Sequence, residues 1–294
     1  MANINDEGFL ELSGMHQTSS GENLNANSFP ILAGLTPLSL RVLNQASHVI
    51  HVVKGVEMMR AGDTPHDLYF IKSGSVGIGK LNNDKVEIIA KLRSGDFYGE
   101  YGALRGKAMF VSVYATEASE IIRVDLNAMQ QVFVADEGFK GRIYDVMQER
   151  LLNSFLFNYP VFKTLPSGTI DLLAKELKVV HLERDEMLFH EGDAAELYYL
   201  ILSGKAEITV VLNEVPTVIE VRREHQVLGE LRSEDGAKYS YGVYAANSID
   251  LLVLDKDSMQ SIKKAGAEIL PALQDTLKHS AKVTLSLIKK SLKT

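Results

Sequence analysis

An internal repeat with a period of 130 residues constrains this chain more than any other feature. With that shift the two halves align without a gap. The matched pairs include Phe29-Pro30 with Tyr159-Pro160, Gly62-Asp63 with Gly192-Asp193, Ser73-Gly74 with Ser203-Gly204, Gly99-Glu100 with Gly229-Glu230, and Gly106 with Gly236. Glycine reaches positive φ without strain, so glycines that recur in register indicate backbone turns that are used twice. Two copies of one domain are therefore predicted.

Each copy is predicted to be mostly β. "DLYFIKSGSVGIGKL" and "LYYLILSGKAEITVVL" are β-branched and aromatic runs interrupted by Ser-Gly, a pattern typical of two strands joined by a tight turn. Strands this short and this regularly spaced favour a sandwich or a small barrel. Helical periodicity brackets the strands, before them at 37–47 and 167–177 and after them at 127–157 and 258–292. The predicted organisation is a mobile tail at 1–27, a first domain at 28–158 and a second at 159–294.

The composition limits the classes of protein to which the chain can belong. Of its 294 residues 46% are hydrophobic and 23% are charged, which is typical of a globular protein. The formal charge of -7 argues against nucleic acid as a partner. No run approaches the roughly 20 apolar residues of a membrane span, the first residues lack a secretory signal, and the chain has no cysteine. We expect a cytoplasmic protein with no membrane span and no metal centre.

The ordered motifs carry a family resemblance. A helix, Gly-Asp ahead of "LYFI", Ser-Gly in a turn, Gly-Asp followed by Gly-Glu, and closing helices together resemble the cyclic-nucleotide-binding domain. The pair is similar to the tandem domains in regulatory subunits of cyclic-AMP-dependent kinase, and each copy to the sensor half of the catabolite activator protein. The resemblance implies a mainly β fold with flanking helices, made of two jelly-roll (double-stranded β-helix) domains.

The same resemblance places a phosphate-binding cassette after each Gly-Glu. It implies that Gly99-Glu100 and Gly229-Glu230 open the cassettes, that the glutamates accept from a ribose 2'-hydroxyl, and that an arginine farther on pairs with the cyclic phosphate. Consecutive amides in a short helical turn suit an anion, and small residues let a ligand approach the backbone. Gly102 and Ala103 meet this requirement in the first copy, whereas the second copy has Arg232 where the first has Gly102.

The expected arginine is missing from both copies. Counted back from the closing "VYA", its position falls on Met109 and on Tyr239. A charge-assisted hydrogen bond contributes roughly 1.5–3 kcal/mol, so we expect cyclic-nucleotide affinity to be weakened by about 10- to 100-fold. Arg105, Lys107 and Lys238 lie close enough in sequence to supply a charge instead.

Three functions remain open at this point. The favoured one is a non-enzymatic regulatory or adaptor protein without a cofactor that acts through protein contacts. Neither a winged helix after the last strand nor an arginine in residues 1–27, as a kinase pseudosubstrate would need, is present in the sequence. The first alternative is a genuine sensor of cyclic AMP or cyclic GMP that uses the first cassette with Lys107 or Arg105. The second is a jelly-roll enzyme.

The C-terminal helix is the predicted contact surface. From Pro271, apolar residues follow at helical spacing: Leu273, Leu277, Ala281, Leu285, Ile288 and Leu292. Such a stripe has to be buried against something. It can cover its own barrel, pair with a second chain or dock on a protein partner, and we expect self-association through it.

Overall fold

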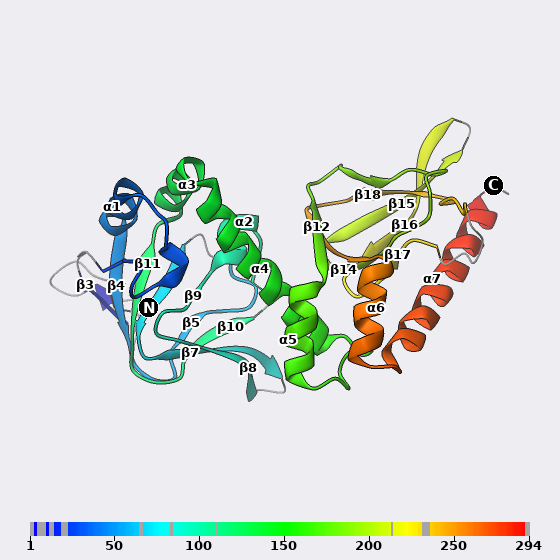
Figure 1. Ribbon diagram of the computed structural model, residues 1–294. Helices are drawn as coiled ribbons and strands as arrows, with labels where there is room; N and C mark the ends of the chain where they lie inside the picture. Colours follow the sequence, from blue (N-terminus) through cyan, green and yellow to red (C-terminus); the bar gives the residue numbers. More distant parts are fainter. Residues whose placement is uncertain are drawn as a thin grey trace. The chain divides into compact units, whose positions relative to one another are not determined.

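The computed structural model describes residues 23–64, 67–82, 85–109, 111–212, 214–230 and 236–291, together with three short strands nearer the N-terminus (Figure 1). The chain divides into two compact units, Met1–Met147 and Gln148–Thr294. The division falls inside one long helix, whereas the predicted boundary at 158/159 lies at the end of that helix.

The first unit contains two larger antiparallel sheets, ordered β5-β10-β7-β8 and β3-β4-β11-β6-β9, and the antiparallel pair β1-β2. Its strands are β1 (Asn3–Ile4), β2 (Leu10–Glu11), β3 (Met15–Thr18), β4 (Ser47–Val52), β5 (Glu57–Met59), β6 (Leu68–Ser73), β7 (Ser75–Asn82), β8 (Lys85–Arg93), β9 (Phe97–Tyr98), β10 (Ser112–Ala115) and β11 (Ser119–Val124). Its helices are η1 (Pro30–Leu32), α1 (Pro37–Gln45), α2 (Glu100–Arg105), α3 (Leu126–Ala135) and α4 (Glu137–Asn158), which continues into the second unit.

The second unit repeats this arrangement with sheets ordered β12-β19-β14-β17 and β13-β18-β15-β16. Its strands are β12 (Lys178–Leu182), β13 (Met187–Phe189), β14 (Tyr198–Ser203), β15 (Lys205–Leu212), β16 (Val215–Arg223), β17 (Val227–Leu228), β18 (Gly242–Ala245) and β19 (Ile249–Leu254). Its helices are α5 (Ser167–Glu176), α6 (Lys256–Ala265) and α7 (Ile269–Ser291). The predicted mainly β class with flanking helices is confirmed.

Local chemistry explains why the elements begin and end where they do. The Ser-Gly turns between β6 and β7 and between β14 and β15 have Gly74 at φ 82° and Gly204 at φ 91°, as the repeated glycines predicted. The predicted helix at 127–157 is two helices, because Asp136 lies between them and its carboxylate accepts from the amide of Phe139 at 2.7 Å. A side-chain acceptor of this kind stabilises the start of a helix.

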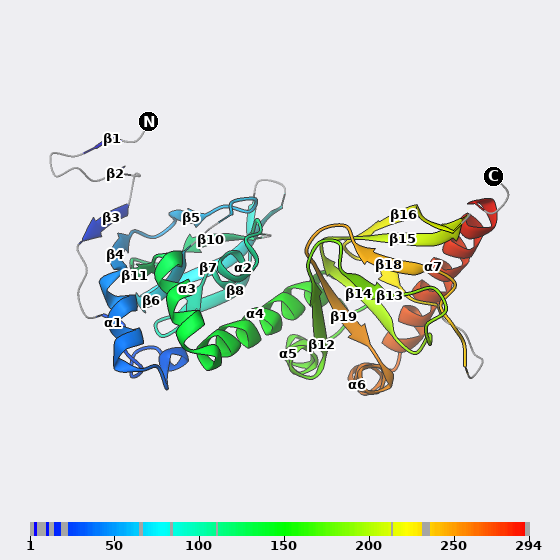
Figure 2. The same cartoon turned by 90° about the horizontal axis from the view of Figure 1, so that it is seen from above.

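Two expectations about the ends of the chain need correction. Leu24 falls in the predicted mobile tail, yet it is buried in the first core and exchanges hydrogen bonds of 2.8 and 2.9 Å with Asn44. Helix α7 runs along β16 and β17 of its own unit (Figure 2) and buries Leu273 and Leu277 there. Much of the predicted apolar stripe is therefore covered without a second chain.

Candidate functional site

The turn that opens each cassette requires glycine. Gly99 and Gly229 have φ 96° and 104°, a region that other residues rarely adopt. A Cβ at Gly99 would lie 2.6 Å from the carbonyl oxygen of Asp67, and one at Gly229 would lie 2.8 Å from that of Leu197. The recurring Gly-Glu is thus explained by the backbone whether or not a ligand binds.

The two cassette glutamates are both buried, but their surroundings differ. Glu100 lies in the first turn of α2, where the helix dipole favours a carboxylate. Glu230 accepts hydrogen bonds from its own chain, from the amide of Ser240 at 2.7 Å and from the Ser240 hydroxyl. Each cassette holds a buried acceptor, and Ser240 is a hydrogen-bond partner of the second one.

The two anchor positions, Met109 and Tyr239, have equivalent backbone pairing. The amide of Gly62 donates to the Met109 carbonyl and the amide of Met109 to the Asp63 carbonyl, both at 2.8 Å. In the second unit, the corresponding bonds join Tyr239 to Gly192-Asp193 at 2.8 and 2.9 Å. The repeat therefore aligns these positions in space as it does in sequence.

Neither anchor side chain carries a charge suited to phosphate. Met109 is half-buried and packs against the apolar cluster that includes Tyr98 and Val113. Tyr239 is buried, with its ring 3.7 Å from that of Phe189 and its hydroxyl donating to the Leu197 carbonyl at 2.6 Å. Burial raises the pKa of Tyr239 well above the ordinary value, so the phenol is neutral. A buried, stacked and neutral tyrosine thus occupies the position at which the family resemblance implied an arginine.

The neighbouring basic residues lie in different surroundings. Arg105 donates to the Tyr144 hydroxyl at 3.0 Å, with its guanidinium carbon 4.9 Å from the centre of that ring. This contact directs Arg105 toward α4, within the first unit. Lys107 is half-buried, while Lys238 is exposed and its backbone bridges to Ala194. Arg232 lies outside the described residues.

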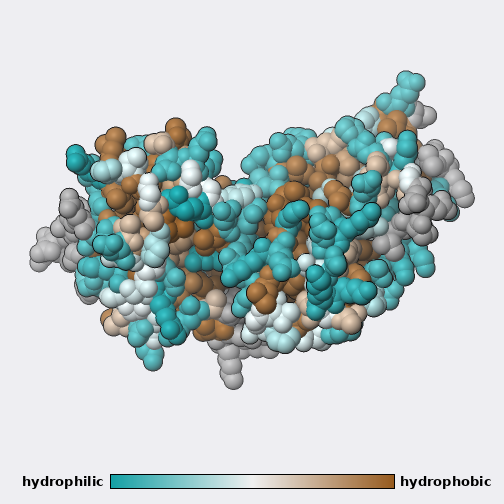
Figure 3. Space-filling model, in the orientation of Figure 1, coloured by the Kyte–Doolittle hydropathy of each residue, from teal (hydrophilic) through white to brown (hydrophobic). Residues whose placement is uncertain are grey.

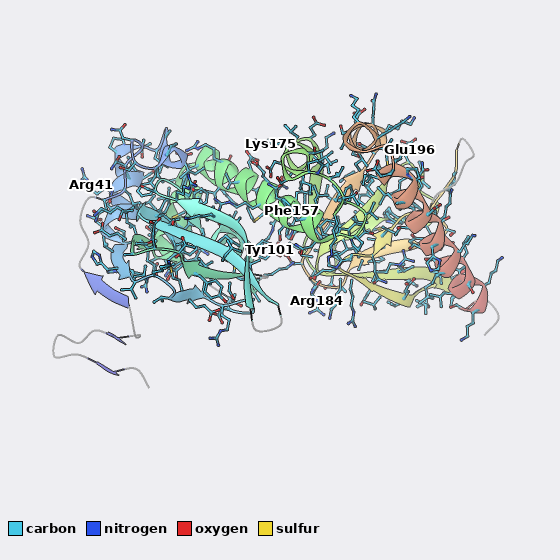
Figure 4. All side chains as sticks on the ribbon, turned by 90° about the horizontal axis from the view of Figure 1, so that it is seen from below. Arg41, Tyr101, Phe157, Lys175, Arg184 and Glu196 are labelled. Atoms are coloured by element: carbon cyan, nitrogen blue, oxygen red, sulfur yellow. The ribbon has the colours of Figure 1, made fainter. Side chains whose placement is uncertain are left out.

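Helix α2 contributes a glycine, an alanine and a tyrosine to the first cassette, and all three are buried or half-buried. Gly102 is buried and accepts the 2.8 Å hydrogen bond from Gly106 that ends α2. Ala103 is half-buried and packs against the core. Tyr101, labelled in Figure 4, is buried on the same helix.

A buried arginine near the second cassette was missed by the sequence analysis. Arg222 is 2% exposed and lies within 3.2 Å of both carboxylate oxygens of Glu220. Its guanidinium also donates to the Val227 carbonyl and to the Thr284 hydroxyl on α7. Arg222 thus fastens the C-terminal helix to β17, next to Gly229. Its counterpart in the first copy is Leu92, and this exchange of leucine for arginine was the available signal.

A second cluster bears on the enzyme alternative. Asp250 is buried, with His181 Nδ1 at 2.8 Å from one oxygen and the Ser203 hydroxyl donating to the other at 2.8 Å. A nucleophilic triad needs the serine on the histidine, whereas this serine bonds the aspartate. Within the described part of the chain, no three His, Cys, Asp or Glu residues are grouped as a metal site. Over the same residues, no helix is long and apolar enough to cross a membrane.

The comparison with protein families decides which family this is. The model for the cyclic nucleotide-binding domain matches residues 49–136 and 179–265, together more than half of the chain. The chain belongs to the cyclic nucleotide-binding domain family. One match lies in each half, as the repeat predicted.

Among curated proteins, this member of the cyclic nucleotide-binding domain family is similar to cAMP-dependent protein kinase regulatory subunits. Those of Eremothecium gossypii and Mucor circinelloides are each 23% identical, over 74% and 82% of this chain. The matches span 44% and 52% of those relatives, so the chain spans about half their length. The matched relatives are regulatory subunits, in agreement with the predicted non-enzymatic class.

Solved structures of regulatory subunits also match. The regulatory domain of Toxoplasma gondii protein kinase A with cAMP is 16% identical, with a TM-score of 0.37 over 86% of this chain and 94% of that one. The regulatory subunit of a cAMP-independent protein kinase A from Trypanosoma brucei is 17% identical, with a TM-score of 0.39 over 89% and 92%.

Proposed function

We propose that this chain is a non-enzymatic regulatory protein whose cyclic nucleotide binding is weakened in the first domain and lost in the second. The observation that supports this proposal is that Met109 and Tyr239 occupy the positions at which the family resemblance implies an arginine. Neither can make the bidentate pair that a guanidinium makes with phosphate. Losing that hydrogen bond costs roughly 1.5–3 kcal/mol, or about 10- to 100-fold in affinity.

The second domain is the more severely altered. A ligand entering its cassette would have to displace the Tyr239 ring from Phe189 and compete with Ser240 for Glu230. Both changes expose apolar surface or leave a buried carboxylate short of hydrogen bonds, and both are unfavourable. We therefore assign no cyclic nucleotide to the second domain.

The output of such a protein is contact with another protein. The relatives that match are regulatory subunits of a kinase, so a kinase catalytic subunit is the first candidate partner. Pull-down of a purified catalytic subunit on immobilised full-length chain tests this part of the proposal. Absence of binding with and without cyclic AMP would remove the kinase and leave the adaptor role to another partner.

A cyclic-nucleotide sensor is the second candidate, and the buried Glu100 favours it. In this reading the first domain binds cyclic AMP or cyclic GMP through Glu100 and the amides near Gly102, and Lys107 supplies the charge that Met109 lacks. A point charge on a flexible stem is weaker and more sensitive to salt than a bidentate pair. Lys107→Ala should then weaken binding and flatten its dependence on salt.

Calorimetric titration of the full chain separates the two candidates. Cyclic AMP, cyclic GMP and the uncharged nucleosides adenosine and guanosine form the ligand set. The proposal expects at most one weak site per chain, lost in Glu100→Ala and unchanged in the matched control Glu230→Ala. Tight binding that Glu100→Ala abolishes establishes the sensor. Two sites per chain, or a site that Glu230→Ala removes, would contradict the assignment of the second domain.

A further inference from the structure

The outer face of the β15–β16 hairpin is unusually apolar. Along β15 the inward side chains of Ala206, Ile208 and Val210 are buried, so the alternate residues face outward. On that outer side, Val211, Val218 and Val221 are 55%, 48% and 42% exposed. We call these three residues the valine face. In Figure 3, hydrophobic side chains lie near the end of this hairpin, beside hydrophilic ones at its tip.

The strand register places the valine face on one side of the sheet. Val221 is paired with Glu207, Val218 with Thr209 and Val211 with Pro216, and residues paired across strands point to the same side. Glu207 borders the valines on the side of β18 and would lie at the rim of a contact. A contiguous exposed apolar group of this kind marks an interaction site more often than an isolated valine does.

The first unit does not present the same surface. At the period of the repeat, Leu81 and Ile88 stand at the positions of Val211 and Val218, whereas Lys91 stands at the position of Val221. Lys91 is exposed on β8, the edge strand of its sheet, and an exposed lysine on a sheet edge opposes pairing with another chain. The first hairpin therefore has a charge at one of the three positions of the valine face.

The charges at the two ends of the hairpin identify the occupant. Lys205 and Arg223 are paired at its base and both are exposed, next to the exposed Glu224, so the base carries a net positive charge; Glu214 is exposed at its tip. At about 3.3 Å per residue, base and tip lie roughly 20–25 Å apart. Exposed charges at that distance are screened from each other, since the Debye length is about 8 Å at physiological salt. They are complementary only between two hairpins that run in opposite directions.

We propose that the valine face binds a second copy of this chain, hairpin against hairpin, with the basic base of each beside the acidic tip of the other. The contact is face to face, because Pro216 on the edge strand lacks the amide that strand addition would use. This pairing is two-fold symmetric and closes on itself as a dimer. It does not depend on ligand binding in either domain.

Sedimentation velocity on the full chain over roughly 1 to 100 µM tests the proposal, a range chosen because weak dimers dissociate within it. The natural protein is expected to dimerise, and Val218→Glu or Val221→Lys to raise the dimer dissociation constant by at least about tenfold. Ile88→Glu, at the matching exposed position of the first unit, is the control and should leave the mass unchanged. Circular dichroism confirms that each variant is folded.

A charge exchange tests the orientation. Arg223→Glu and Glu214→Arg should each weaken the dimer at low salt, and the double variant should regain part of that loss, because the two exchanged charges attract each other while Lys205 keeps its sign. A natural protein that stays monomeric at 100 µM, or equal effects of Val218→Glu and Ile88→Glu, would overturn the proposal. A dimer that the single charge variants leave intact would overturn the antiparallel arrangement.

Discussion

The two cassettes have the same backbone geometry and differ in the contacts that their side chains make. In both, a glycine at positive φ precedes a buried glutamate, and the anchor residue is hydrogen-bonded to a Gly-Asp turn. In the first, Met109 packs on the apolar core and Arg105 lies on Tyr144. In the second, Tyr239 stacks on Phe189 and Ser240 bonds Glu230. Backbone geometry can thus persist where the chemistry of recognition changes.

The two units also differ in the polar contacts between the cassette and the closing helix. In the second unit, the guanidinium of Arg222 joins β17 to Thr284 on α7, while the Tyr241 hydroxyl is bonded to the amide of Gly229 at 2.9 Å. The first copy has Leu92 and Val111 at the positions of Arg222 and Tyr241. The second unit therefore joins its closing helix to β17 through its own polar groups.

The largest effect is expected from breaking this fastening. Arg222→Leu would leave Glu220 without its cation, the Thr284 hydroxyl without the guanidinium that donates to it, and the Val227 carbonyl with the 3.4 Å hydrogen bond from the Ser280 hydroxyl. Removing one partner of a buried ion pair costs about 3–5 kcal/mol. Urea denaturation followed by circular dichroism should show this loss in the second unit, and hydrogen exchange should rise along α7.

Arg184→Leu is the control for that change. Arg184 is an arginine of the second unit that is 76% exposed, and its ion-pair partner Asp185 is 86% exposed, so its removal should alter the stability by no more than about 0.5 kcal/mol. Equal losses from the two substitutions would show that the network around Arg222 does not hold the helix.

The sequence predicted the repeated features well and the unrepeated ones poorly. Turn glycines such as Gly74 and Gly204 could be predicted from the local sequence, because a residue without a Cβ adopts positive φ without strain. The spacing to "VYA", which is the same in both copies, placed Met109 and Tyr239 at matching positions, and their backbone pairing matches; that they are anchor positions stays a prediction. The contact between Arg222 and Thr284 could not be predicted, because it joins residues 62 positions apart and the first copy has Leu92 at the position of Arg222, so the repeat gives no second example of it.

The next largest loss of stability is expected from replacing the glycine that opens the second cassette. Gly229→Ala should destabilise the second unit by about 2–5 kcal/mol, because positive φ costs a residue with Cβ roughly 1–2 kcal/mol and the clash with the Leu197 carbonyl adds about 1–3 kcal/mol. Gly192→Ala has nearly the same φ, 93°, but its Cβ would meet nothing within 4 Å. It should cost only about 1–2 kcal/mol. Equal losses in urea denaturation would show that the close approach of backbone at Gly229 is not required.

Introducing an arginine at each predicted anchor position compares the ability of the two cassettes to bind cyclic AMP. Met109→Arg should raise cyclic AMP affinity by about 10- to 100-fold, which corresponds to roughly 1.4–2.7 kcal/mol. Tyr239→Arg should give no affinity, because it places a cation where the ring is buried against Phe189 and leaves Glu230 bonded to Ser240. Calorimetry on both variants is the measurement. Equal gains would mean that the second cassette lost only its arginine, and no gain in Met109→Arg would place the anchor elsewhere.

The smallest effect is expected from removing one hydrogen bond of the second cassette. Tyr239→Phe keeps the stack on Phe189 and removes the hydroxyl that donates to the Leu197 carbonyl at 2.6 Å. A neutral hydrogen bond contributes about 0.5–1.5 kcal/mol, so the unfolding free energy of the second unit should fall by about 1 kcal/mol. Met109→Leu is the control in the first unit, since an isosteric apolar exchange usually costs less than about 1.5 kcal/mol and should not alter the second unit. If Tyr239→Phe leaves stability unchanged, the tyrosine fills its position by its ring alone, and the carbonyl of Leu197 is satisfied without it.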